Sequence, residues 1–215
     1  MADTDSSRDD LHQRWRRLFP TAGHDALFSE LAAAYSAPDR HYHNLAHIAD
    51  CLRRADDVRI FLTDFRAVAT ALFFHDAVYD PTRSDNEERS ADLAENRLRG
   101  LREPEPFIAT VRDLILDTRH VTSPATGDGR HVVDIDLAIL GAPPAEFDAY
   151  EHAIRLEYAH VPDDAFRRGR ARILRSFLDR PRIYGTDHFR DLYEAPTRAN
   201  LARSLAALTT PTARG

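Results

Sequence analysis

Histidine and aspartate residues gather in three short segments of this chain, and both residue types are ligands for divalent metal ions. The first segment is His41–His47, the second contains the doublet His75-Asp76, and the third is Val133–Asp136. Imidazole nitrogens and carboxylate oxygens from separate segments can share one ion. Such an ion can activate a bound water for hydrolysis. The three segments therefore indicate metal-assisted hydrolysis.

The first motif lies where a loop is expected to enter a helix. Asn44 is a residue type that caps helix N-termini, so we predict that a helix begins at Leu45. His43 and His47 are four residues apart, and this spacing places two helical side chains on one side. A proton donor and a metal ligand could share such a site, although polar surface histidines near a cap show the same pattern.

The second motif ends an apolar helix. Val68, Ala71 and Leu72 follow helical spacing, and the stripe continues to His75, which predicts that His75 faces the core. A buried imidazole and a buried carboxylate both need a polar or charged partner. A metal ion reached by both His75 and Asp76 would supply that partner.

The third motif is expected in a short helix over Asp134–Leu140, with Asp136 in its first turn. Acidic residues are favoured in a first turn by the helix dipole, so this carboxylate alone is explained by capping. Asp136 is nevertheless a candidate metal ligand because of the order of the motifs: His47 comes first, the doublet at His75 second and Asp136 last.

This order resembles that of the HD superfamily of metal-dependent phosphohydrolases, which have a histidine, a later His-Asp doublet and a distant aspartate. The segments Arg40–Asn44, Phe74–Pro81, Asp85–Glu87 and Asp134–Leu137 look like a bacterial branch of predicted HD phosphohydrolases. The resemblance covers about 40–141, which we take as the motif core. It implies a helical HD-type domain.

The resemblance also implies a ligand set and a mechanism. The ligands would be His47, His75, Asp76 and Asp136, holding a divalent ion that could be manganese, zinc, nickel, cobalt, magnesium or iron. The pattern around His43 is similar to that of cyclic-nucleotide phosphodiesterases, which implies that His43 donates a proton to the departing oxygen. The implied substrate is a small phosphorylated compound, with nucleotides among the candidates.

The chain departs from these relatives after the doublet. The phosphodiesterases have a further histidine three residues after the doublet's aspartate, and Tyr79 stands there in this chain. Some bacterial HD nucleotidases have a catalytic glutamate at that offset, and the nearest carboxylate here is Asp80. We therefore expect Asp80 to orient water or substrate, with helix capping as the alternative, and we leave open whether one or two ions bind.

Further basic residues are candidates for binding the substrate. Arg40, Arg83 and Arg119 could each hold a phosphate, because a guanidinium binds two oxygens at once, although exposed arginines commonly only solvate a surface. His120 follows an apolar helix and precedes a loop rich in Ser, Pro, Gly and Asp. It could be a pocket histidine, a second-metal ligand or a cation on the helix dipole.

Apolar residues recur at helical spacing along most of the chain, with prolines between the periodic segments. We predict an all-α fold, an HD-domain-like bundle of about ten helices. The length of 215 residues suits one domain over 1–215, with polar ends at 1–7 and 209–215. The expected helices are Leu11–Phe19, His24–Tyr35, Leu45–Ala55, Asp64–Asp76, Asn86–Leu101, Pro106–Thr118, Asp134–Leu140, Pro144–Tyr158, Asp163–Leu178, His188–Tyr193 and Ala195–Ala207.

Composition limits the partners. The net charge is −6 and no long basic run occurs, so we expect no nucleic-acid polymer as the main partner. No apolar stretch approaches the roughly 20 residues of a membrane span, which predicts a cytoplasmic protein without a membrane partner. The single cysteine, Cys51, is expected to be a small buried hydrophobic residue. The oligomeric state, including a homodimer, stays open.

Two other functions remain as alternatives to a phosphohydrolase. Some HD-fold proteins bind two irons and activate dioxygen, which would require further ligands such as His120. A catalytically silent binding module would retain the metal for structure alone. Iron content and oxygen consumption distinguish the oxygenase from the phosphohydrolase. The absence of any phosphatase activity would indicate the binding module.

Overall fold

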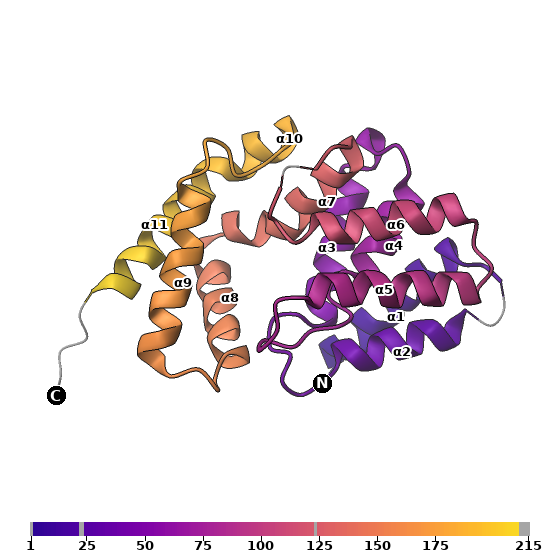
Figure 1. The fold of residues 1–215 in the computed structure, drawn as a ribbon, viewed down its shortest axis with the longest axis horizontal. Coiled ribbons are helices and arrows are strands. Elements are labelled where there is room, and N and C mark those ends of the chain that lie inside the picture. The colour runs from indigo at the N-terminus through magenta and orange to yellow at the C-terminus, as the bar shows by residue number, and fades with distance from the viewer. Residues whose placement is uncertain (1, 22–23, 123, 211–215) are drawn as a thin grey trace. The chain divides into compact units, whose positions relative to one another are not determined.

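The computed structural model describes residues 2–21, 24–122 and 124–210, which form helices and connecting loops with no strand among them (Figure 1). The predicted all-α fold of about ten helices is confirmed. Its likeness to an HD domain stays a prediction. The chain divides into two compact units, 1–135 and 136–215, which are described separately. The prediction of one domain over 1–215 is not tested by this division.

The first unit is built on a buried helix, α4 (Phe65–Phe74), in which every residue from Ala67 to Phe74 is buried. A helix that is apolar on all sides belongs in a core. Helices α3, α5 and α6 contact it, and α5 and α6 lie side by side (Figure 1). The other elements of this unit are α1 (Ala2–Leu18), α2 (Asp25–Tyr35), α3 (Leu45–Asp57), η1 (Arg59–Phe61), α5 (Asn86–Gly100), α6 (Glu105–Asp117) and most of α7 (Gly127–Leu137).

Hydrogen bonds hold the N-terminal end of α4, and an aromatic contact holds its C-terminal end. The carboxylate of Asp64 caps the helix by accepting a hydrogen bond from the Ala67 amide at 2.9 Å. The buried carboxylate of Asp128, on α7, accepts hydrogen bonds from the amides of Thr63 and Asp64, each at 2.8 Å. Trp15 packs edge-on against Phe73, with ring centroids 5.2 Å apart. These contacts fix the axis of α4, and therefore the residues that follow it.

The third motif lies in a longer helix than the sequence predicts. Helix α7 begins at Gly127 and ends at Leu137, where a 3-10 turn, η2 (Ala138–Gly141), continues the chain. The prediction that Asp136 lies in the first turn of a helix starting near Asp134 is therefore wrong, because Asp136 lies near the C-terminal end of α7. Two glycines in the segment Gly127–Gly129 favoured a loop there, and the Asp128 contacts with the α4 region stabilise a helix instead.

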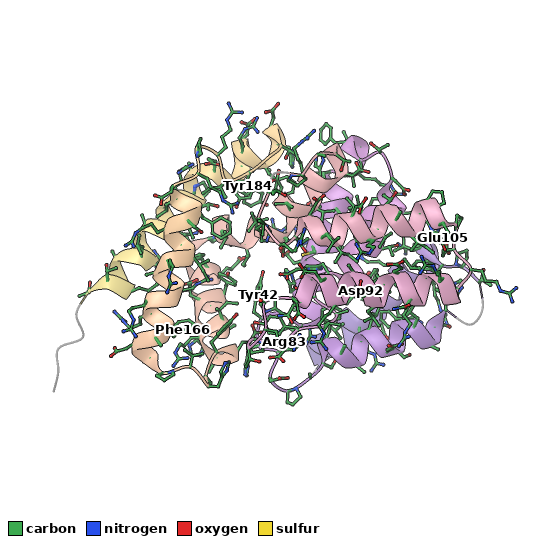
Figure 2. All side chains as sticks on the ribbon, viewed as in Figure 1. Tyr42, Arg83, Asp92, Glu105, Phe166 and Tyr184 are labelled. Atoms are coloured by element: carbon green, nitrogen blue, oxygen red, sulfur yellow. The ribbon has the colours of Figure 1, made fainter. Side chains whose placement is uncertain are left out.

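The second unit is a smaller helical assembly. It contains α8 (Pro144–Glu157), α9 (Asp163–Leu178), α10 (Asp187–Phe189), the π-turn η3 (Arg190–Glu194) and α11 (Ala195–Thr209), in addition to η2. Helices α9 and α11 lie side by side (Figure 1). The hydroxyl of Tyr184, labelled in Figure 2, donates to the Leu137 carbonyl at 3.0 Å and lies 2.7 Å from the Thr197 hydroxyl.

The polar N-terminal segment belongs to a helix. Helix α1 begins at Ala2, so most of the segment 1–7 is helical. At the other end, α11 reaches Thr209, and 211–215 lie outside the described residues. Among the residues that the structure describes, no helix is both long and apolar enough to cross a membrane.

The Asp128 contacts yield a stability prediction. Asp128→Ala leaves the Thr63 and Asp64 amides without their acceptor, so we expect the free energy of unfolding to fall by about 1 to 3 kcal/mol in urea denaturation. Asp113→Ala, at an exposed aspartate of α6, is the matched control and should change it by less than about 0.5 kcal/mol. Equal effects of the two substitutions would contradict this role of Asp128.

Candidate metal centre

The first histidine of the site is positioned by a helix cap. The side-chain oxygen of Asn44 accepts hydrogen bonds from the amides of Ala46 at 2.9 Å and His47 at 3.4 Å, which confirms the predicted N-cap of α3. His47 therefore lies in the first turn of α3. Its side chain is only 3% exposed, so the imidazole faces the interior of the first unit.

The second histidine follows the last residue of α4. The His75 amide still donates to the Ala71 carbonyl at 2.8 Å, so the buried helix carries this side chain into the interior. Its Nδ1 lies 2.9 Å from the carbonyl oxygen of Leu72. A carbonyl only accepts, so Nδ1 bears the hydrogen, and in a neutral ring Nε2 keeps its lone pair. This arrangement is the usual support of a metal-binding histidine.

Three donor atoms meet at this point. The Nε2 atoms of His47 and His75 are 3.2 Å apart, and Oδ2 of Asp76 lies 3.0 Å from the His75 Nε2 and 3.4 Å from the His47 Nε2. Because Nδ1 of His75 donates its hydrogen to the Leu72 carbonyl, Nε2 of a neutral His75 would direct its lone pair at the carboxylate oxygen of Asp76. The contact is favourable only with a positive charge, either a second proton on the ring or a cation among the three atoms.

The separations fit a metal ion. Metal–ligand bonds of about 2.0 to 2.1 Å at tetrahedral angles hold two nitrogen or oxygen donors roughly 3.3 Å apart. The three measured separations, 3.0, 3.2 and 3.4 Å, lie within a few tenths of an ångström of that value. The residues present therefore fit a divalent ion of zinc-like size.

Electrostatics keep the carboxylate of Asp76 charged. Burial by itself would raise the pKa of Asp76, but the positive charge of the His75 and His43 imidazoles, together with hydrogen bonds from His47 and His75 in their protonated forms, outweighs it. The pKa of Asp76 is consequently well below its usual value. Asp76 also follows the C-terminal end of α4, and Asp136 lies near that of α7, where the helix dipole disfavours a negative charge. Both carboxylates gain from a cation.

A wider group of ligand types surrounds this point. One donor atom each from His47, Cys51, His75 and Asp136 lies within 4.8 Å of the others. The group includes three of the four predicted ligands, and the fourth, Asp76, adjoins it through the two imidazoles. Asp136 is the first residue past the division between the two units, on a helix that begins in the first unit.

Cys51 was missed as a candidate. The prediction that it is buried is confirmed, but its sulfur lies 3.7 Å from a ring nitrogen of His47 rather than among apolar side chains alone. The signal was present in the sequence, because Cys51 follows His47 by four residues and α3 places such residues on one face.

The predicted proton donor lies beside these residues. The His43 ring stacks on the Tyr79 ring, with centroids 4.2 Å apart and planes 29° apart, and its centroid is 6.1 Å from that of His47. Tyr79 thus supports the His43 ring from one side.

Arg40 joins the first two motifs. Its guanidinium donates to three backbone carbonyls, those of His43 at 3.1 Å, Asp76 at 2.6 Å and Ala77 at 2.9 Å. It also lies over the rings of Tyr35 and Tyr79, at 5.0 and 5.5 Å from their centroids. The predicted phosphate contact of Arg40 stays a prediction, and the contacts observed make this side chain a brace of the site.

Two predicted residues lie on the loop between α4 and α5. The carboxylate of Asp80 accepts hydrogen bonds from the amide of Thr82 at 2.9 Å and its hydroxyl at 2.6 Å, which stabilises a turn. Arg83 forms two hydrogen bonds with Asp85, at 2.7 and 2.6 Å. Figure 2 shows Arg83 and Tyr42 at one end of the first unit, away from Glu105. Roles in catalysis and substrate binding stay predictions for Asp80 and Arg83.

The remaining two predicted residues follow α6. Arg119 donates to Glu88 at 2.9 Å and to the Leu116 carbonyl at 3.0 Å. His120 has a φ of 56°, a left-handed conformation that is uncommon outside glycine. Burial raises the pKa of Glu87, whose carboxylate also interacts electrostatically with Asp76 and His120. Glu87 is thus within electrostatic range of both Asp76 and His120. The predicted role of His120 stays a prediction.

Comparison of the chain with known protein families, with characterised proteins and with solved structures found no match. The resemblance to the HD superfamily therefore rests on the motif residues.

The brace formed by Arg40 is testable. Arg40→Lys keeps the charge but replaces the planar fork with a single ammonium group, so we expect the free energy of unfolding to fall by about 1.5 to 3 kcal/mol. The measurement is urea denaturation followed by circular dichroism. Arg172→Lys, at an exposed arginine of α9, is the control and should have almost no effect. A similarly small effect at Arg40 would show that the three carbonyl contacts do not support the fold.

The donor geometry predicts metal uptake. The purified protein, dialysed against zinc or manganese, should retain about one equivalent by elemental analysis, and His75→Ala should retain far less because it removes a central donor. His152→Ala, at an exposed histidine of α8, should retain as much as the parent. Circular dichroism checks that the variants are folded. No metal in the parent after either dialysis would overturn the site.

Proposed function

We propose that this chain is a divalent-metal-dependent phosphohydrolase of the HD type, acting on a small phosphorylated compound such as a nucleotide. The observation that carries the proposal is the convergence of His47, His75 and Asp76 at 3.0 to 3.4 Å. They come from the first two motifs of the HD pattern, in an all-helical chain. The proposal includes a cytoplasmic protein with a small-molecule partner.

The residues of the chain would divide the chemistry among them. His47, His75 and Asp76 would hold the ion, with Asp136 as a further ligand, and the Leu72 carbonyl would keep the His75 ring in the binding orientation. The bound ion supplies an activated water and polarises a phosphoryl oxygen, so that no protein nucleophile is required.

His43 would protonate the departing oxygen. Its ring lies close enough to Asp76 to lower the pKa of that carboxylate, and Tyr79 covers one face of the imidazole. A proton donor in this position faces the same region as the ligands without being one of the three central donors. Protonation of the leaving oxygen by a positioned side chain typically accounts for about 10² to 10⁴ in rate.

The two alternative functions give different results in one set of measurements. A di-iron oxygenase would purify with two equivalents of iron and consume oxygen, whereas a phosphohydrolase releases inorganic phosphate. A binding module would retain metal but release no phosphate from any substrate. In that case Asp76→Ala would lower the thermal stability and change no activity.

The role of His43 can be separated from metal binding. In a screen of nucleotides and other phosphorylated compounds, we expect phosphate release by the parent protein and a decrease of about 10² to 10⁴ in His43→Ala. Metal content should be unchanged, because the central donors remain. His41→Ala, at an exposed histidine two residues earlier, is the control and should keep full activity.

Two outcomes would contradict this assignment. Loss of metal from His43→Ala would make His43 a ligand rather than a proton donor. No phosphate release by metal-loaded parent protein, over the whole panel and with each of the six metals, would reject the proposed function.

A further inference from the structure

The sulfur of Cys51 lies next to the ligand histidines. Cys51 is on α3, one turn after His47, and is 1% exposed. Its Sγ is 3.7 Å from Nδ1 and 3.7 Å from Nε2 of His47. It belongs to the group of donors that lie within 4.8 Å of one another. The motif residues that carry the resemblance to the HD superfamily include no cysteine.

The distance to one ring nitrogen is close to that of a shared ion. Bonds of about 2.3 Å to sulfur and about 2.0 to 2.1 Å to nitrogen, at tetrahedral angles, separate the two donors by roughly 3.6 Å and leave the sulfur roughly 5 Å from the other ring nitrogen. The measured separation is 3.7 Å from both nitrogens of His47, so the Cys51 side chain has to rotate away from the ring face to share an ion bound at Nε2. The nitrogen pair of His47 and His75, at 3.2 Å, fits the same geometry. Two imidazoles, a thiolate and a carboxylate are a donor set typical of zinc.

We propose that Cys51 binds the metal ion as a thiolate and thereby makes the site selective for zinc over magnesium and manganese. The inference rests on the metal site of the proposed function and adds a ligand and a metal preference to it. Thiolates favour soft and borderline ions, whereas magnesium and manganese prefer oxygen donors. A site of imidazoles and carboxylates alone would lack this preference.

Cobalt(II) is the probe, because it takes the place of zinc and its absorption reports the ligands. Metal-free full-length protein is titrated with cobalt(II) without oxygen. We expect visible d–d bands of a low-coordinate ion and, in the near ultraviolet, a sulfur-to-cobalt charge-transfer band that saturates at one equivalent. The chain contains one cysteine, so this band can arise only from Cys51.

Two variants complete the experiment. Cys51→Ser and Cys51→Ala should keep the d–d bands and lose the charge-transfer band, with circular dichroism as the check of folding. In competition titrations, zinc affinity should fall by more than about 10-fold, the loss seen even when a residue that only supports a ligand is removed. Magnesium affinity should not change.

The outcomes separate this inference from the proposed function. Cobalt d–d bands without a charge-transfer band in the parent protein would mean that the ion binds and Cys51 does not, which overturns the thiolate and leaves the metal site intact. No change in absorption on adding cobalt would overturn the site itself. The parent spectrum decides between these results even if both variants fail to fold.

Discussion

The geometry of the candidate site depends on the guanidinium of Arg40. This group bonds the carbonyl of His43, in the loop before α3, and those of Asp76 and Ala77, after the end of α4. Loops that leave a helix have carbonyls without helical partners, and a planar cation with several donors satisfies them together. His43 and Asp76 are thereby fixed relative to each other through their backbones. Only the side-chain rotamers of these two residues then remain to be ordered.

A second constraint comes from where the charged groups stand on the helices. Helix α4 is buried from Ala67 to Phe74, and His75 and Asp76 follow directly after its last residue. Asp136 stands near the end of α7. Helix ends of this polarity repel carboxylates and attract cations. The fold therefore concentrates negative charge at a place where the backbone does not stabilise it, and a bound cation would relieve both effects at once.

Sequence patterns correctly predicted the structural features that depend on interactions within a single helix. The cap at Asn44 follows from its residue type and the inward direction of His75 from spacing within one helix, and both are confirmed. The helix that carries Asp136 was predicted with the wrong start, because its first turn is stabilised by contacts with a segment far away in sequence. The brace formed by Arg40 depends on the meeting of two loops, which no local pattern contains. Cys51 lay within reach of the spacing argument, but its residue type suggested a hydrophobic core position.

The stacking of His43 on Tyr79 has a consequence for the timing of entropy loss. An imidazole on an open loop samples several rotamers, and ordering such a side chain at the moment of binding costs about 0.5 to 1.5 kcal/mol. Here one face of the ring lies against the phenol ring, with centroids 4.2 Å apart, before any substrate arrives. The conformational entropy of this side chain is given up when the chain folds. A ligand entering the site would meet a ring whose orientation is already chosen, and its own binding energy would not be spent on that step.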